Sequence, residues 1–225
     1  MKLATLGRKL FSTLLDVLAP PRCVACDACD PNASGYCAEC GEPEPLLDVA
    51  CHIHGVPVFA GARYGEPIAS VIQRFKYGAA PELCAPLASL SVRGIDLLGI
   101  EPGDMWVPVP LHPLRLAERG YNQAALLARE LSRSAHGRVD ARRLCRLRNT
   151  EQQAKKNRRA RGENIEAAFA ARDRRGKLGL GQRVVLVDDV VTTGATLGAC
   201  INALRAAGDE VVGCMAAAYT DAASR

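Results

Sequence analysis

Two adjacent carboxylates followed by a short polar loop are the residues best suited to chemistry in this chain. Asp188 and Asp189 come directly after the apolar run Val184–Val187, and a Thr- and Gly-rich loop, residues 192–196, follows them. The apolar run predicts a buried strand, and Leu197–Ala207 predicts a helix. A Gly/Thr loop that opens a helix offers N–H groups, hydroxyls and the positive end of the helix dipole to a phosphate. The carboxylates can accept hydrogen bonds from sugar hydroxyls or help to hold hydrated Mg²⁺, so the pattern indicates a phosphorylated sugar as ligand.

Residues 184–197 resemble the 5-phosphoribosyl-1-pyrophosphate (PRPP) motif of type I phosphoribosyltransferases: a hydrophobic strand, two acids, two apolar residues and Thr-Thr-Gly-Ala-Thr. The resemblance implies that Asp188 and Asp189 contact the ribose 2′ and 3′ hydroxyls. The alternative is a strand–turn–helix whose acids only cap the helix. Val-Asp-Asp also occurs in receiver domains, although near their start, and the Walker nucleotide-binding pattern is absent. The resemblance assigns the 5′-phosphate to Thr192, Thr193, Gly194, Ala195 and Thr196.

Six of the ten cysteines lie close together, between residues 23 and 51. Four of them form two pairs with two residues inside each pair and ten residues between the pairs. Four thiolates at this spacing can close a tetrahedral structural Zn²⁺ site, and Gly41 permits a tight turn that brings N–H groups to the thiolates. A segment this short and poor in apolar residues needs the metal to supply its folding free energy. The predicted ligands are Cys23, Cys26, Cys37 and Cys40.

A disulfide framework is the alternative for these cysteines, and an intracellular metabolic domain disfavours it. The scattered cysteines are expected to be buried small hydrophobes, and they are Cys84, Cys145, Cys200 and Cys214. Four further residues stay open as spare ligands, a second partial site or ordinary side chains, namely Cys29, Cys51, His52 and His54.

A zinc module ahead of a phosphoribosyltransferase motif resembles the ComF/GntX-like family, bacterial phosphoribosyltransferase homologues linked with DNA uptake during competence. Three more stretches carry this resemblance: Val107–Gln123, Thr150–Phe169 and Phe75-Lys76-Tyr77, with Tyr121 and Phe75 replacing the family's Phe and Leu. It spans about residues 20–220 and implies an α/β fold, a central parallel sheet flanked by helices with a small N-terminal four-cysteine zinc module. It also implies PRPP and Mg²⁺ as ligands, and single-stranded DNA or competence proteins as candidate partners.

A proline-rich loop is expected to end the first central strand, Met105–Val109, because proline fixes φ and removes a hydrogen-bond donor. In type I phosphoribosyltransferases the corresponding loop embraces the pyrophosphate and Mg²⁺. Arg115 and Arg119 follow at i, i+4, so a helix would place both on one face, where guanidinium groups suit pyrophosphate. The alternative is a solvated helix start. The loop residues assigned in this way are Pro110, Leu111 and His112.

Residues 142–177 carry thirteen Lys and Arg against four Asp and Glu, whereas the whole chain has a net charge of only +5. Such a concentration of charge favours a polyanion, either pyrophosphate or a nucleic-acid backbone. Thr150–Asn164, between expected strands Leu144–Leu147 and Ala167–Ala170, is expected to be a mobile loop. By resemblance it is a hood that closes over PRPP, the alternative being a solvated loop. Its candidate ligand-contacting residues are Lys155, Lys156, Arg158 and Arg161.

At Thr192 this chain departs from the pattern of some type I phosphoribosyltransferases, and the departure limits what can be inferred about catalysis. Some family members that transfer to nucleobases carry an acidic general base where Thr192 stands, and others do without one, so activity is possible but the acceptor stays open. No aromatic-rich pocket for a base is visible in the sequence.

The expected organisation is an amphipathic helix over residues 1–20, a zinc-knuckle module over 21–51 and a phosphoribosyltransferase-like domain over 55–225. Val56–Tyr64 begins the α/β part, whose central parallel sheet should contain Met105–Val109, Val184–Asp188 and Val211–Ala217. No run of 18 uncharged apolar residues exists, so no membrane span is expected. The N-terminus mimics a signal peptide, but Asp16 and the following thiols favour a cytoplasmic protein. The oligomeric state stays open.

Overall fold

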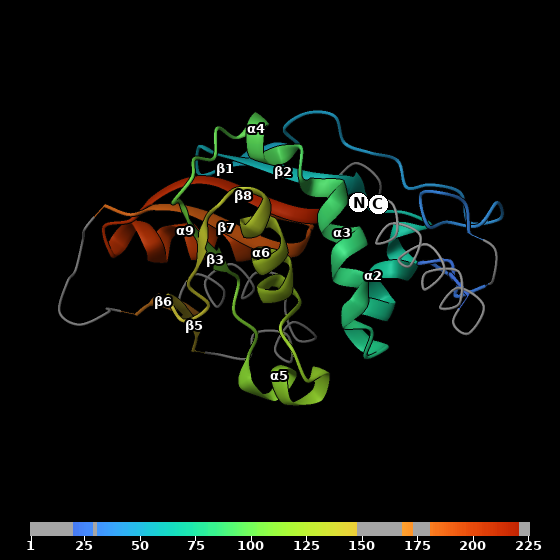
Figure 1. Cartoon of the computed structure of the whole chain (residues 1–225). Helices are drawn as coiled ribbons and strands as arrows, with labels where there is room; N and C mark the ends of the chain where they lie inside the picture. The colour runs from blue at the N-terminus through green and yellow to red at the C-terminus, as the bar shows by residue number, and fades with distance from the viewer. Residues whose placement is uncertain (1–19, 29–30, 148–167, 173–180, 221–225) are drawn as a thin grey trace, which may run out of the picture.

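The computed structural model describes residues 20–28, 31–147, 168–172 and 181–220. A six-stranded sheet forms its centre, in the order β1-β2-β8-β7-β3-β4 (Figure 1). All neighbours are parallel except β1, which pairs antiparallel with β2. The predicted α/β class with a central parallel sheet is therefore confirmed. The strands are β1 (Cys51–Ile53), β2 (Val56–Arg63), β3 (Met105–Pro108), β4 (Arg138–Val139), β7 (Arg183–Val191) and β8 (Glu210–Tyr219).

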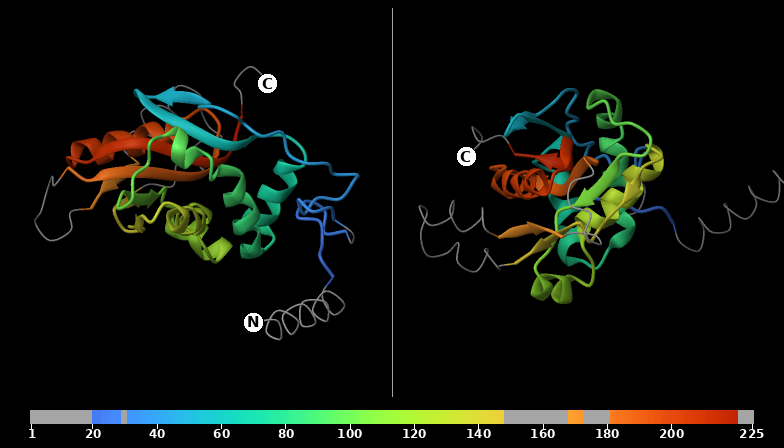
Figure 2. Two further views of the ribbon diagram at one scale, coloured as in Figure 1. Left: turned by 45° about the horizontal axis from the view of Figure 1, so that its top comes forward. Right: turned by 90° about the vertical axis from the view of Figure 1, so that its left-hand side faces the viewer.

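Helices cover both faces of the sheet, as the uninterrupted apolar strands require. Val185 and Val187 of β7 pack in one cluster with α2, α3 and α6, whereas Val184 and Leu186 pack in a second cluster with α9. Figure 2 shows α9 and α6 on opposite sides of the strands. The helices are α2 (Ile68–Tyr77), η1 (Pro81–Leu83), α3 (Cys84–Ser91), α4 (Gly94–Leu97), α5 (Pro113–Arg119), α6 (Gln123–Ser134) and α9 (Ala195–Ala206).

Strand β7 is longer than the sequence predicts. The apolar run suggests that the strand ends at the acid pair, but the strand continues through Val191. The continuation follows from pairing, since Val190 and Val191 lie opposite Ala218 and Tyr219 of β8. The strand expected to end at Asp188 therefore continues past both acids, which lie within it.

A separate two-stranded ribbon lies beside α9, made of β5 (Leu144–Arg146) and β6 (Phe169–Ala171), which pair antiparallel. It confirms the expected strand pair within one or two residues at each end. Leu144 and Phe169 pack in the α9 cluster. The segment between these strands, with the proposed hood residues Lys155, Lys156, Arg158 and Arg161, lies outside the described residues.

The N-terminal module packs on the C-terminal half of α2, where Figure 2 shows it beside the helix. Arg74 of α2 donates to the Val24 carbonyl at 2.8 Å and forms an ion pair of 3.1 Å with Asp27. Tyr36 and Cys37 are buried in the same cluster as α2. The module thus shares a core with the sheet domain. Residues 1–19, for which an amphipathic helix is expected, lie outside the described part.

None of the described helices is long and apolar enough to cross a membrane.

Candidate functional site

The acid pair sits near the carboxyl end of β7, where ligands bind in parallel α/β sheets. Successive side chains of a strand point to opposite faces, so Asp188 and Asp189 diverge. Asp188 faces the α9 side and lines a small pocket with Val190 and residues 191–197. Asp189 is 9% exposed and faces the α2 side. The two acids stay linked, because the N–H of Asp189 donates to the Asp188 carboxylate at 2.9 Å.

The loop after β7 has the shape that phosphate binding requires. Gly194 precedes α9 with φ 75°, a left-handed conformation that glycine adopts at little cost, and it provides no side-chain cap. The first N–H groups of a helix have no acceptor within the helix, so those of Thr196 and Leu197 are available to an anion, whereas the Ala195 N–H donates to the Thr193 hydroxyl at 3.5 Å. A side chain at Gly194 would also meet Ile53 of β1, whose Cδ1 lies 2.6 Å from the position of a Cβ. The pocket of Asp188 is lined by Thr192, Thr193, Gly194, Ala195 and Thr196.

Lys76, near the end of α2, is the site residue to which sequence analysis assigns no role. Its Nζ lies 2.9 Å from a carboxylate oxygen of Asp189. Burial disfavours the ammonium, but the charge of Asp189 and its hydrogen bond outweigh burial and raise the pKa of Lys76. The only signal in the sequence is the family-like triplet Phe75-Lys76-Tyr77, because the contact joins residues more than one hundred positions apart.

The surroundings favour the charged form of Lys76 but disfavour the charged form of Asp188. Burial, and after it the negative charge of Asp189, raise the pKa of Asp188 to about 7, although Lys76 and Arg146 both act to lower it. Even with Lys76 beside Asp189, ionising both acids of the pair therefore costs free energy near neutral pH.

The predicted pyrophosphate loop, Pro110, Leu111 and His112, leads directly into α5. His112 caps this helix, its Nδ1 accepting from the Leu114 N–H at 3.4 Å. The two arginines of α5 have different partners. Arg115 pairs with Glu118 at 2.8 Å, whereas Arg119 donates to the Tyr77 hydroxyl and the Gln123 amide oxygen, each at 3.2 Å.

Two motif stretches that are distant in sequence are joined here. The Tyr121 hydroxyl donates to the Phe75 carbonyl, which also accepts from the Gln123 amide at 3.3 Å. Asn122 caps α6 and donates to the Val109 carbonyl at 3.0 Å. Residues 119–123 therefore link the end of α2 to the end of β3 by hydrogen bonds, and these bonds position Lys76.

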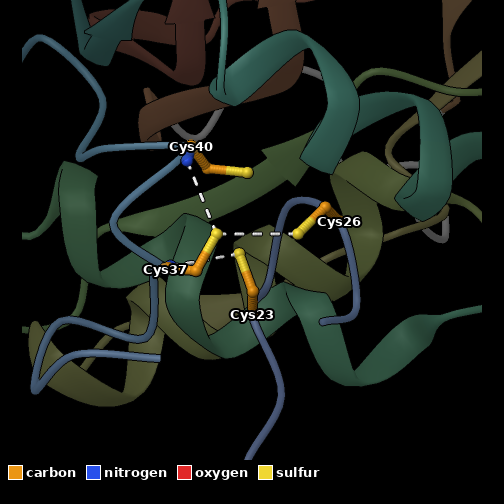
Figure 3. Close-up of side chains that lie close together, drawn as sticks. All are labelled: Cys23, Cys26, Cys37 and Cys40. Atoms are coloured by element: carbon orange, nitrogen blue, oxygen red, sulfur yellow. Dashed lines mark hydrogen bonds between the residues drawn. The ribbon is translucent and has the colours of Figure 1, made fainter. Parts of the chain in front are cut away.

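The four predicted zinc ligands come together in one cluster, in which all four sulfur atoms lie within 4.8 Å of one another (Figure 3). Cys26 and Cys37 sulfurs are 3.7 Å apart, close to the roughly 3.8 Å expected between ligands of a tetrahedral Zn²⁺ with bonds of about 2.3 Å. Backbone N–H groups also reach the thiols, from Cys37 to Cys23 Sγ at 3.3 Å and from Cys40 to Cys37 Sγ at 3.4 Å. The donor set fits a structural zinc ion.

The thiols of this cluster ionise unequally. Burial opposes ionisation of Cys23, but backbone hydrogen bonds from Cys26, Cys37 and Ala25 prevail and lower its pKa to about 6. Hydrogen bonds with the Cys26 and Cys37 side chains raise the pKa of Cys40. The pKa values of Cys26 and Cys40 are both raised, so their deprotonation is favoured only when a cation joins them, which is the behaviour of a metal site.

Two of the residues left open by the sequence belong to the sheet domain. Cys51 and His52 lie in β1, and among the described residues the four-cysteine cluster includes neither. His54 hydrogen-bonds Asn202 of α9 at 2.9 Å. Cys29 lies outside the described residues.

Two domain families match this chain, and together they define its class. The phosphoribosyl transferase domain matches residues 116–225 and the double zinc ribbon domain matches residues 14–71. The first match begins inside α5 and contains β7, the loop and α9. The second contains all four clustered cysteines. This is a phosphoribosyltransferase-domain protein with an N-terminal zinc ribbon.

Relatives narrow the class further. Competence protein F of Haemophilus influenzae is 31% identical over 196 residues, covering 85% of this chain and 82% of that protein. DNA utilization protein YhgH of Escherichia coli K12 is 30% identical over 186 residues, covering 78% and 80%. Competence protein ComFC of Bacillus subtilis is 34% identical over 134 residues, covering 60% and 52%. The chain belongs to the ComF family.

Proposed function

We propose that this protein binds PRPP with Mg²⁺ and transfers the phosphoribosyl group to an acceptor, in DNA uptake or in nucleotide salvage. The observation that carries the proposal is the pocket in which Asp188 meets the open N-terminus of α9. A carboxylate suits the ribose hydroxyls, and uncapped N–H groups suit the 5′-phosphate. The zinc ribbon has a structural role in this proposal, holding its ion through the four clustered thiols.

The chemistry is a displacement at C1 of the ribose. The nucleophilic atom of the acceptor forms a bond to C1 while the C1–oxygen bond to diphosphate breaks, and diphosphate leaves with the electron pair. Mg²⁺, when bound, neutralises the developing charge on diphosphate. Asp188 and Asp189 hold the sugar and stabilise positive charge that develops on the ring. Thr192 supplies no carboxylate base, so the acceptor proton leaves by another route.

A thermal-shift titration of the zinc-loaded protein with PRPP, with and without Mg²⁺, tests the proposal. Ligand at a hundredfold excess over Kd adds about 2.7 kcal/mol of stability, which raises Tm by roughly 5–10 °C. The double variant Asp188→Asn with Asp189→Asn should lose the shift and any turnover while keeping its zinc. Asp96→Asn, at an exposed position of α4, is the matched control and should keep the shift. No shift of the wild type at millimolar PRPP would refute PRPP binding.

A second candidate is a non-catalytic protein that senses PRPP or a nucleotide, or that binds DNA or a competence partner, through the same fold. The net positive charge of residues 142–177 and the names of the relatives favour it. Binding of fluorescent single-stranded DNA should then weaken steeply with salt. Neutralising Lys155, Lys156, Arg158 and Arg159 should flatten the salt dependence, whereas the acid-pair variant should keep its affinity. DNA affinity indifferent to salt would exclude this candidate.

A further inference from the structure

Two glycines let the β1–β2 turn, residues 53–55, come close to α9. Gly194 precedes the helix and Gly198 follows four positions later, so both lie on one face. The Cδ1 of Ile53 lies 2.6 Å from where a Cβ at Gly194 would be, and Cε1 of the His54 ring lies 3.1 Å from that position at Gly198. Glycine inside a helix is less favourable than alanine. The close approach of His54 gives a physical reason for glycine at position 198.

Polar contacts hold the same turn on the helix. His54 and Gly55 have φ 50° and 77°, and two left-handed residues in succession are typical of tight hairpin turns. Asn202 Oδ1 accepts from His54 Nδ1, and Arg205 donates to the His54 carbonyl, each at 2.9 Å. Asn202 and Arg205 follow Gly198 on the same face of α9. One face of the helix thus contacts the β1–β2 turn along most of its length.

The β1–β2 turn touches the phosphate loop but does not line the ligand pocket. Among the described residues, β7, the loop and the start of α9 line the pocket of Asp188, and the turn contributes none of the lining. We propose that the β1–β2 turn positions the phosphate loop, with Ile53 and His54 as positioning residues for binding of the 5′-phosphate. This inference rests on the proposed function and gives a role to His54, which sequence analysis leaves open.

The loop needs such a support because of its glycine. A glycine backbone has more conformational freedom than that of any other residue, so Gly194 by itself orders the loop poorly. The N–H groups of Thr196 and Leu197 bind an anion well only when they converge on it. Ile53 fills the space beside Gly194 and limits its movement, while the φ of 75° stays accessible. A loop that is ordered before binding loses less entropy when the ligand arrives, so affinity is higher.

The affinity of the zinc-loaded full chain for Mg²⁺–PRPP and for ribose 5-phosphate tests the inference, measured well below the Tm of each variant. Both probes carry the 5′-phosphate, so Ile53→Ala should weaken both by the same factor. We expect roughly 3- to 30-fold, with the upper value set by the cost of ordering one residue's backbone. Ile53→Leu keeps a δ carbon and should restore most of the affinity. A role in stability alone would lower Tm and leave both affinities unchanged.

A pair of substitutions tests the contact between the turn and the helix. Gly198→Ala adds a methyl group against the His54 ring, so it should weaken both probes although alanine favours a helix. In a His54→Ala background the ring is absent, and Gly198→Ala should then change the affinities by less than about twofold. His136→Ala is the matched control, because His136 is also exposed and has φ 52°, and it should bind like the wild type.

The outcomes separate this inference from the proposed function. Unchanged affinity of Ile53→Ala, a loss confined to PRPP, or an equal effect of Gly198→Ala with and without the His54 ring would overturn the inference and leave PRPP binding intact. A wild type that binds neither probe would instead refute the proposed function, and this inference with it.

Discussion

Asp188 should cost stability in the empty protein, because it lies beside Asp189 at a partly buried position. Replacing it with Asn removes the titrating group, and the amide oxygen can still accept from the Asp189 N–H. We expect the unliganded Asp188→Asn variant to be more stable than the wild type at pH 8. Binding sites commonly carry such a cost, since a group arranged for a ligand is not arranged for stability.

The magnitude follows from the pKa of Asp188, which folding raises from an ordinary 3.8 to about 7. Between these two values the native state binds more protons than the unfolded state, so the free energy of unfolding falls as pH rises. Above pH 7 the loss is complete and amounts to about 4 kcal/mol, at 1.36 kcal/mol for each pKa unit. In a chain of this size that corresponds to roughly 10 °C in Tm.

The assay is thermal unfolding of zinc-loaded wild type and Asp188→Asn without Mg²⁺ or phosphate, at several pH values from 4 to 8. The advantage of the variant should be small near pH 4, grow between pH 4 and 7, and be constant above pH 7. Asp96→Asn, exposed on α4, is the control and should show no such growth. A variant less stable than the wild type at pH 8, or an advantage independent of pH, would refute the reasoning.

Three further predictions concern the supports of the site. Arg143 is 8% exposed and pairs with Asp209 at 2.7 Å, so Asp209→Ala would leave a buried charge without its partner. This variant should lower the free energy of unfolding by about 3–5 kcal/mol in denaturant titrations. A loss under about 1 kcal/mol would show that the pair contributes little. Gly194→Ala places a side chain at φ 75°, so it should lower the free energy of unfolding by about 1–3 kcal/mol and abolish the thermal shift with PRPP. PRPP binding like that of the wild type would show that the loop tolerates a side chain. Cys37→Ser should bring metal content below one zinc per chain by elemental analysis while Cys145→Ser keeps it, and equal zinc in both would contradict the four-thiol site.

Features carried by contiguous residues could be predicted from the sequence. The strand, acids, loop and helix of residues 184–207 occupy one stretch, so their order already implies a phosphate pocket at the end of a strand. The thiol cluster follows from spacing in the same way, because two residues between cysteines allow both sulfurs to bind one ion. The apolar runs indicated the parallel sheet, since strands buried on both faces lack alternation.

The end of a strand, and the sheet face to which each of its side chains points, depend on neighbouring strands that the local sequence pattern does not reveal. The sequence suggests that the strand ends at Asp188, yet β8 continues alongside and extends β7 to Val191, which turns the two acids toward opposite faces. A local hairpin, in which Cys51 of β1 pairs with Val58 of β2, brings Cys51 into the sheet and away from the zinc ligands.

The sequence by itself determined which groups can bind phosphate, ribose and zinc, because those groups are neighbours along the chain. Only the tertiary structure decided that Lys76 pairs with Asp189, and that Tyr121 and Gln123 hold the turn that carries it. The physical reason is that an ion pair depends on distance in space. Packing α2 against the sheet sets that distance, and residues adjacent in sequence do not record it.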